Sequence, residues 1–321
     1  MYEFEPMYLT ILLETANVTG PIFILVILGV LLKRIGFISD AFVQSSSKLV
    51  FSLCLPVLLF TTISQIDLDE SFDLDVFNFS IVASCLTFTL SWLVAVIFVK
   101  PRKDRGVFVQ GSFRSNLGVV GLALCSNAFG AEGLVLASLL LASMTFTYNI
   151  LCVLVLSYYN ADQTVTLRAV TLDILKNPLI ISIAIAVLVN VLSIPIPTIL
   201  LSAGDYLGQL ALPLALLGCG AGMNLRALRS SSTLTVLAVL LKTLLLPLVV
   251  TLLAWQLGFT GLSLGVLFLL FVSPTATASF IMVKSMGGND VLAANLIMVT
   301  TLVSIFTCSL GLFLLRVWNL V

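Results

Sequence analysis

The stretch Gly111-Ser-Phe-Arg-Ser-Asn-Leu-Gly-Val-Val-Gly121 places an arginine, two serines, an asparagine and three glycines inside a long hydrophobic run. In lipid, every backbone group without a hydrogen-bond partner costs several kcal/mol, so an irregular or polar segment is tolerated at membrane depth only where protein or a water-filled cavity surrounds it. This stretch therefore predicts one half of a binding site inside a membrane protein.

The composition supports a membrane location. Of the 321 residues, 60% are hydrophobic and 9% are charged, against about 25% charged in an ordinary soluble domain. At about 20 residues per membrane-spanning helix, the chain can hold about ten spans and has no room for a soluble catalytic domain. The six cysteines all lie in apolar segments and form neither a disulfide framework nor a metal-binding spacing: Cys54, Cys85, Cys125, Cys152, Cys219 and Cys308.

Apolar runs and the residues that interrupt them predict an all-α polytopic membrane protein. The expected helices lie at about 7–33, 41–64, 76–99, 105–129, 132–158, 177–192, 204–223, 233–257, 262–285 and 291–317.

The charges between these helices predict the orientation, because the more basic loops stay in the cytoplasm. The outer loops collect acidic residues such as Asp67, Glu70 and Glu132, and Arg316 is the clear basic exception. We expect a cell (inner) membrane protein with both termini outside. The basic residues at the inner ends are Lys33, Arg34, Lys100, Arg102, Lys103, Arg105, Arg168, Lys176, Arg226, Arg229 and Lys284.

An internal repeat predicts the architecture. Pro21 lies 157 residues before Pro178, and Pro56 lies 157 residues before Pro213. Asn116 lies 158 residues before Pro274, so these two residues match when the spacing is increased by one residue. The expected units are residues 1–158, a cytoplasmic linker 159–176, and residues 177–321. With an odd number of helices in each unit, the second must be inverted relative to the first, as in secondary transporters.

The predicted fourth and ninth helices carry the matching interruptions. In the ninth, Pro274 removes a backbone donor, and Ser273, Thr275 and Thr277 supply hydroxyl groups. Two crossing broken helices would direct their half-helix N-termini, each with about half a positive charge, at a common point. Such a point attracts anions.

At these residues the chain resembles the auxin efflux carrier family, within the bile-acid, arsenite and riboflavin transporter superfamily. The resemblance covers nearly the whole chain and is carried by residues 113–121, 176–180, 212–218, 273–277 and 287–290. It implies ten helices, a crossover of the fourth and ninth, and elevator-like transport of small organic anions such as dicarboxylates or, in plants, auxin. It also implies that Asn116 lines the substrate site. Unlike the plant carriers, the chain has no long hydrophilic central loop, and it has no acidic residue between Phe77 and Val99.

The candidate substrate-binding residues gather around the two interruptions. Arg114 either pairs with a substrate carboxylate or extends to the cytoplasmic interface. The glycines either let the backbone approach a ligand or allow close helix packing. The full set is Arg114, Ser115, Asn116, Gly118, Ser273, Pro274, Thr275, Thr277, Tyr148 and Asn149.

Other candidates concern movement and coupling. Pro56, Pro213 and Gly121 are candidates for helix breaks or gating. Glu14, Lys48 and Asp205 are candidates for coupling, although Lys48 and Asp205 lie toward helix ends, where contact with the interface is the simpler explanation. The same explanation applies to Lys242.

These features predict a secondary transporter of a small organic anion, and the alternative is a sodium/proton or other cation-coupled exchanger of the same topology. An enzyme is not expected, because the chain has no histidine for a Ser-His protease and no phosphate-binding loop for ATP-driven pumping. No cofactor is expected apart from a coupling Na⁺ or H⁺. The expected partners are the anion and the lipid bilayer. Nucleic acid is not expected, and a homodimer is left open.

Overall fold

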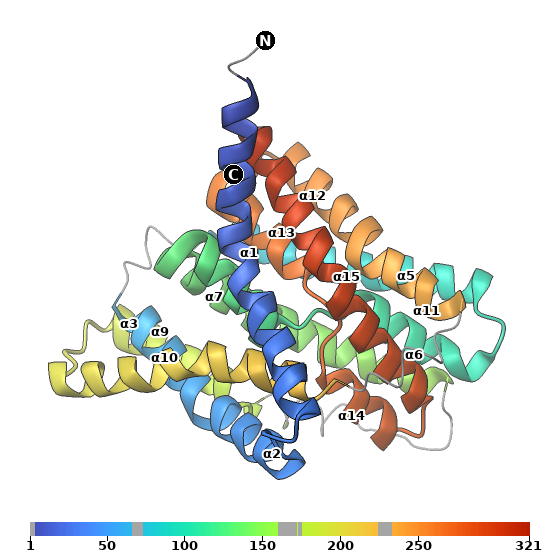
Figure 1. Cartoon of the computed structure of the whole chain (residues 1–321), viewed down its shortest axis with the longest axis horizontal. Coiled ribbons are helices and arrows are strands. Elements are labelled where there is room, and N and C mark those ends of the chain that lie inside the picture. The colour runs from blue at the N-terminus through green and yellow to red at the C-terminus, as the bar shows by residue number, and fades with distance from the viewer. Residues whose placement is uncertain (1–3, 66–72, 160–171, 173–174, 224–232) are drawn as a thin grey trace.

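The computed structural model describes residues 4–65, 73–159, 172, 175–223 and 233–321 (Figure 1). These residues form helices and their connections, and their only β-type pairing is one isolated bridge between Ser115 and Thr275. The α-helices are α1 (Phe4–Arg34), α2 (Asp40–Leu49), α3 (Leu55–Ser64), α5 (Leu74–Phe98), α6 (Arg102–Phe113), α7 (Leu122–Tyr159), α9 (Pro178–Val191), α10 (Thr198–Ala221), α11 (Thr233–Leu240), α12 (Leu246–Gln256), α13 (Gly261–Val272), α14 (Ala278–Ser285) and α15 (Asp290–Val317). Three π-helical turns complete them: η1 (Val50–Cys54), η2 (Leu117–Gly121) and η4 (Leu241–Leu245).

Most helices lie where the apolar runs predict them, and the region 105–158 is interrupted at two places. The helix α6 ends at Phe113, and the 38 residues of α7 consist of two helices that meet at a kink. Inside α7, Gly130 has φ 63° and ψ −143°, a left-handed φ that glycine tolerates at no steric cost. The helical conformation is therefore interrupted at Gly130, between the predicted helices 105–129 and 132–158. The linker 159–176 lies almost wholly outside the described residues, and the division into two units stays a prediction.

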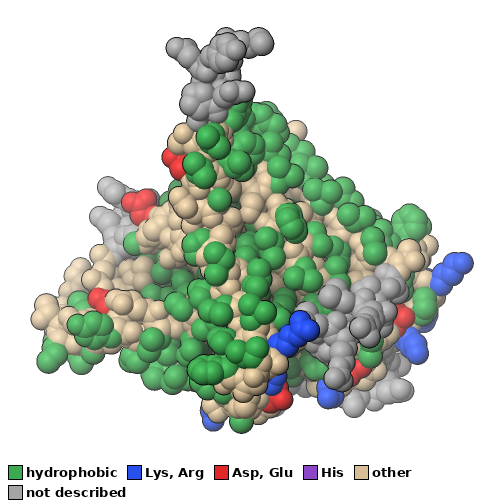
Figure 2. Space-filling model, viewed as in Figure 1, with side chains coloured by type: hydrophobic (Ala, Val, Ile, Leu, Met, Phe, Trp, Pro, Cys, Tyr) green, Lys and Arg blue, Asp and Glu red, His purple; other side chains and the backbone are tan. Residues whose placement is uncertain are grey.

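The outer surface of the described chain is suited to lipid. Seven helical segments are long and apolar enough to cross a membrane, and α9 and α13 are shorter apolar helices. Large apolar side chains such as Ile24, Ile97 and Phe306 are exposed. Figure 2 shows hydrophobic side chains over much of the visible face, with Lys and Arg gathered toward the end opposite the N-terminus. The protein is an integral membrane protein.

The helix α5 shows how a membrane helix distributes its residues. Its buried face carries hydroxyl side chains, while Val82, Leu93 and Ile97 are exposed. Each hydroxyl can bond a carbonyl of its own helix, as Ser84 Oγ does to Ser80 O at 2.7 Å. Polar groups can therefore face the protein interior while the apolar side chains face lipid. The buried hydroxyl residues are Ser80, Ser84, Thr87 and Ser91.

Two sets of helices pack together (Figure 1). In one, α10 packs on α1 and α3, and α3 packs on α9. In the other, α5, α6 and α7 pack on one another, and α13 packs on α7, α12 and α15. The helix α1 also contacts α7 and α15 and so joins the two sets.

Prolines account for two of the π-helical turns. In η1 and η4 the widened hydrogen bonds run from Leu55 N to Val50 O and from Leu246 N to Leu241 O. The next residue in each case, Pro56 or Pro247, has no N–H, and its ring clashes with the carbonyl four residues earlier. The preceding turn widens to accommodate it, and such π-bulges are frequent at functional sites.

Glycines permit the closest approach between α1 and α10. A Cβ atom on Gly220 would lie 1.9 Å from Val26 O, and one on Gly29 would lie 2.2 Å from Leu217 O. By contrast, a Cβ atom on Gly218 would have one described neighbour within 4 Å, Ser47 Oγ at 3.6 Å.

We predict that Gly220→Ala lowers the melting temperature of the purified protein by several degrees, because overpacking against a backbone atom costs about 1–3 kcal/mol. The control Gly218→Ala, two residues away on the same helix, should melt close to the wild type. Equal melting temperatures for the two variants in a detergent thermal-shift assay would contradict the close packing of α1 and α10.

Candidate functional site

The centre of the molecule is a short pairing between two non-helical segments. Residues 114–116 follow the end of α6, and residues 273–277 separate α13 from α14. Asn116 N donates to Pro274 O at 2.7 Å, and Ala276 N donates to Arg114 O at 3.2 Å. The two bonds flank the Ser115–Thr275 bridge symmetrically.

The hydroxyl groups at the bridge repeat this symmetry. Thr275 Oγ1 donates to Gly111 O at 2.6 Å, and Ser115 Oγ donates to Phe271 O at 3.4 Å. Each acceptor lies four residues before the bridge residue of its own segment and in the last turn of its helix. Carbonyls there have no partner within the helix. Each segment therefore satisfies the helix end of the other.

Lys242 also reaches this pairing. Its side chain is 2% exposed, and Nζ donates to Ser115 Oγ at 2.6 Å and to Phe271 O at 2.9 Å. The prediction that Lys242 lies at an interface is therefore wrong. The turn η4 and the packing of α11 against α6 and α15 place the residue inside the protein.

Arg114 extends from the same segment but points away from the bridge. Its guanidinium donates to Asn149 Oδ1 at 2.9 Å and to Met282 Sδ at 3.3 Å. Both acceptors are neutral. The two ion pairs among the described residues, Lys33–Asp40 and Arg316–Glu14, involve neither Arg114 nor Lys242. The positive charge of Arg114 thus has no carboxylate partner in the part of the chain described.

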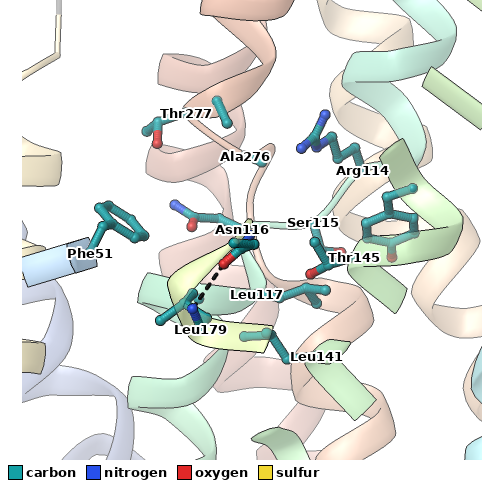
Figure 3. A pocket seen from close by; sticks show the side chains of 14 residues that line it. Phe51, Arg114, Ser115, Asn116, Leu117, Leu141, Thr145, Leu179, Ala276 and Thr277 are labelled. Carbon is teal, nitrogen blue, oxygen red and sulfur yellow. Dashed lines mark hydrogen bonds between the residues drawn. The ribbon is translucent and has the colours of Figure 1, made fainter. Parts of the chain in front are cut away.

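A cavity of about 120 Å³ lies beside the pairing. Figure 3 shows Phe51 and Arg114 on opposite sides of it, with Asn116 between them. No Asp or Glu is among the lining residues that the structure describes. The lining residues are Phe51, Arg114, Ser115, Asn116, Leu117, Gly118, Leu141, Thr145, Tyr148, Asn177, Leu179, Ala276, Thr277 and Ala278.

Some predicted binding residues line this cavity and others support it from outside. Arg114, Ser115, Asn116, Gly118, Tyr148 and Thr277 are in the lining. The other four are in supporting contacts: Ser273 Oγ bonds Leu269 O, Pro274 O accepts from Asn116, Thr275 bonds Gly111, and Asn149 accepts from Arg114.

Tyr148 brings a further polar group to the cavity. Its side chain is 1% exposed, and its hydroxyl lies near Ser115 and Ser84. The hydroxyl groups of these three residues therefore lie together beside the cavity.

The predicted gating and coupling residues do not line the first cavity, although Gly121 N donates to Asn116 O at 3.0 Å. Pro56 follows η1, and Gly121 packs against Leu270 at the end of η2. Pro213 and Asp205 line a second cavity of about 490 Å³ between α1, α3, α7 and α10, which also includes Asn127.

The remaining coupling candidates are exposed. Lys48 has no ion-pair partner in the described chain. Glu14 lies 4.0 Å from Arg316. Neither lines either of the two cavities.

The sequence interpretation missed Lys242, Phe51 and Thr145. Lys242 and Phe51 sit on π-helical turns, η4 and η1, and the third such turn, η2, contributes Leu117 and Gly118 to the cavity. The prolines at 56 and 247 were the signal that could have located two of these turns.

No group of three or more His, Cys, Asp or Glu residues in the described chain is arranged to hold a metal ion.

The protein is helical and polytopic, and it has two paired, polar non-helical segments with a small cavity beside them. This architecture is typical of a membrane transport protein. Comparison with known families agrees. Residues 19–312 match the model of the membrane transport protein family, and the chain belongs to that family. It is a transporter, not an enzyme. The resemblance to auxin efflux carriers agrees with this match, and the wider superfamily stays a prediction.

Two curated proteins are similar over nearly their whole lengths. An "Uncharacterized transporter" of Methanothermobacter thermautotrophicus is 27% identical over 90% of this chain and 94% of its own. A "Putative malonate transporter" of Rhizobium meliloti is 27% identical over 94% of this chain and 97% of its own.

We predict different effects for the two threonines of the second segment. Thr275→Val should lower the melting temperature, because it leaves the Gly111 carbonyl without its hydroxyl donor, at a cost of about 1–3 kcal/mol. Thr277→Val should melt like the wild type, because Thr277 is exposed in the cavity. A thermal-shift assay in detergent compares them. If Thr277→Val destabilised the protein as much as Thr275→Val, the division into supporting and lining residues would be wrong.

Proposed function

We propose that this protein is a secondary transporter that moves a small organic anion, such as a short carboxylate, across the cell membrane. The observation that carries the proposal is the cavity beside the paired segments, where Arg114, Asn116 and Thr277 meet without a carboxylate among the described lining residues.

The chemistry of the cavity favours an anion. The guanidinium of Arg114 donates to an amide oxygen and a thioether sulfur, which are both neutral, and with five N–H donors it has others for a ligand. A guanidinium matches the two oxygens of a carboxylate. The Asn116 amide and the Thr277 hydroxyl add hydrogen-bond donors. A charged residue this deep in a membrane protein marks a substrate pathway more often than a structural contact.

The size of the cavity favours a small ligand. An engineered cavity of about 150 Å³ is large enough to bind benzene, and this one measures about 120 Å³. A ligand of roughly six or seven non-hydrogen atoms fits that comparison. Malonate, the anion for which the Rhizobium meliloti relative is named, has this size and carries two carboxylates.

We further propose that transport occurs by elevator-type alternating access in a chain of ten spans, arranged as two inverted repeats. In this view broken helix four consists of α6, η2 and residues 122–129 of α7, and broken helix nine consists of α13 and α14. The symmetric hydrogen bonds about the Ser115–Thr275 bridge support this arrangement.

The two cavities support alternating access. The first includes Gly118 of η2, and the second includes Ala123 and Asn127 of α7. At about 1.5 Å per residue, Ala123 and Asn127 lie roughly 7 and 13 Å from Gly118 along the chain. Movement of α1, α3 and α10 against the paired segments would connect one cavity and then the other with a side of the membrane.

The exchanger alternative gains no support, because no Asp or Glu in the described chain lines the first cavity. A coupling Na⁺ or H⁺, a homodimer, and the placement of both termini outside stay predictions.

We predict that Asn116→Ala reduces saturable uptake of radiolabelled malonate into proteoliposomes at least tenfold at low concentration. A hydrogen bond to a charged group contributes about 1.5–3 kcal/mol, and each 1.4 kcal/mol is about tenfold in affinity. The control Asn17→Ala changes the same residue type at an exposed position of α1 and should transport normally. If malonate is not carried, other carboxylates of two to four carbons are tested in the same way. Unchanged transport by Asn116→Ala would contradict the proposed site.

A further inference from the structure

Lys242 is the most deeply buried cation that the structure describes, and its surroundings are neutral. It is 2% exposed, and its ammonium takes part in neither of the ion pairs found among the described residues. Its two hydrogen bonds go to a hydroxyl and a backbone carbonyl. Burial of an ammonium group is costly unless it is paired and hydrogen-bonded, so this position requires an explanation.

The oxygen atoms around Nζ are those that bind an alkali cation. Hard cations take oxygen ligands that include backbone carbonyls. In transporters with interrupted helices, unwound carbonyls and the C-terminal ends of half-helices coordinate Na⁺. Phe271 O lies in the last turn of α13, the end of the helix that carries partial negative charge. The Ser115 hydroxyl is oriented by the bridge to Thr275.

Within the described residues, the other half of the pairing has no such charge. There Gly111 O, the symmetric counterpart of Phe271 O, accepts a hydrogen bond from the neutral hydroxyl of Thr275. The helix α5, which packs on α6, buries serine and threonine residues but no charged residue within its bounds. The symmetric hydrogen-bond frame therefore holds a positive charge at one end only.

We propose that Lys242 is a tethered cation. Its ammonium occupies a monovalent-cation site formed by Phe271 O and Ser115 Oγ, so the chain supplies from its own side chain the charge that a bound Na⁺ or K⁺ would supply there. This goes beyond the proposed substrate site and does not depend on which anion is carried. Because Ser115 precedes Asn116, the same ammonium holds the segment that lines the cavity.

Removing the side chain tests the assignment. In Lys242→Ala the amino group and its stem are lost, and the two oxygens face a space that a small cation can enter. The melting temperature should fall by several degrees and then recover in a saturable way as NaCl or methylammonium chloride replaces N-methylglucamine chloride at constant ionic strength. Lys242→Met is the matched control, because it fills the space without a charge and should show the loss without the recovery.

The wild type provides an independent measurement that does not rely on the variant folding. Its melting temperature, and any rise that malonate causes, should be the same in NaCl and in N-methylglucamine chloride. The proposal is overturned if Lys242→Ala folds but shows no cation-specific recovery, if Lys242→Met is as stable as the wild type, or if the wild type itself requires Na⁺. Normal cation recovery in Lys242→Ala, together with a wild type that carries neither malonate nor any other carboxylate of two to four carbons, would count against the proposed function alone.

Discussion

The rest of the structure depends on one constraint. The backbone polar groups at two helix interruptions need hydrogen-bond partners inside the protein. Lipid offers no hydrogen-bond partner, so groups freed after Phe113 and Val272 must find one within the protein. Each segment pairs with the other through Asn116 N and Ala276 N, and each places a hydroxyl on the last turn of the other's helix. Neither interruption could persist in a membrane alone.

This pairing also determines where the unused polar groups point. With the backbone satisfied, Arg114, Asn116 and Thr277 are available to a ligand in the adjoining cavity. The three π-helical turns bring Phe51, Gly118 and Lys242 to the same region. The hydrogen bonds are symmetric about the bridge, whereas the charge of Lys242 lies on one side of it, and the proposed preference for anions rests on Arg114 in the adjoining cavity.

The sequence predicted the parts of this site that interrupt an apolar pattern. Arg114, Asn116 and Pro274 can be recognised in the sequence because each is unfavourable in a membrane helix. Phe51 does not stand out, since an inward phenylalanine and a lipid-facing one look alike in a hydrophobic run. Lys242 was misplaced because depth in the protein depends on which helices surround a residue.

The most direct test of the account is an experimental structure of the protein with malonate, or with whichever small carboxylate is transported. We expect carboxylate oxygens within hydrogen-bonding distance of Arg114 and Asn116, with the pairing about Ser115 and Thr275 intact. A ligand bound instead in the second cavity, near Asn127 and Asp205, with the first cavity empty, would contradict the central claim.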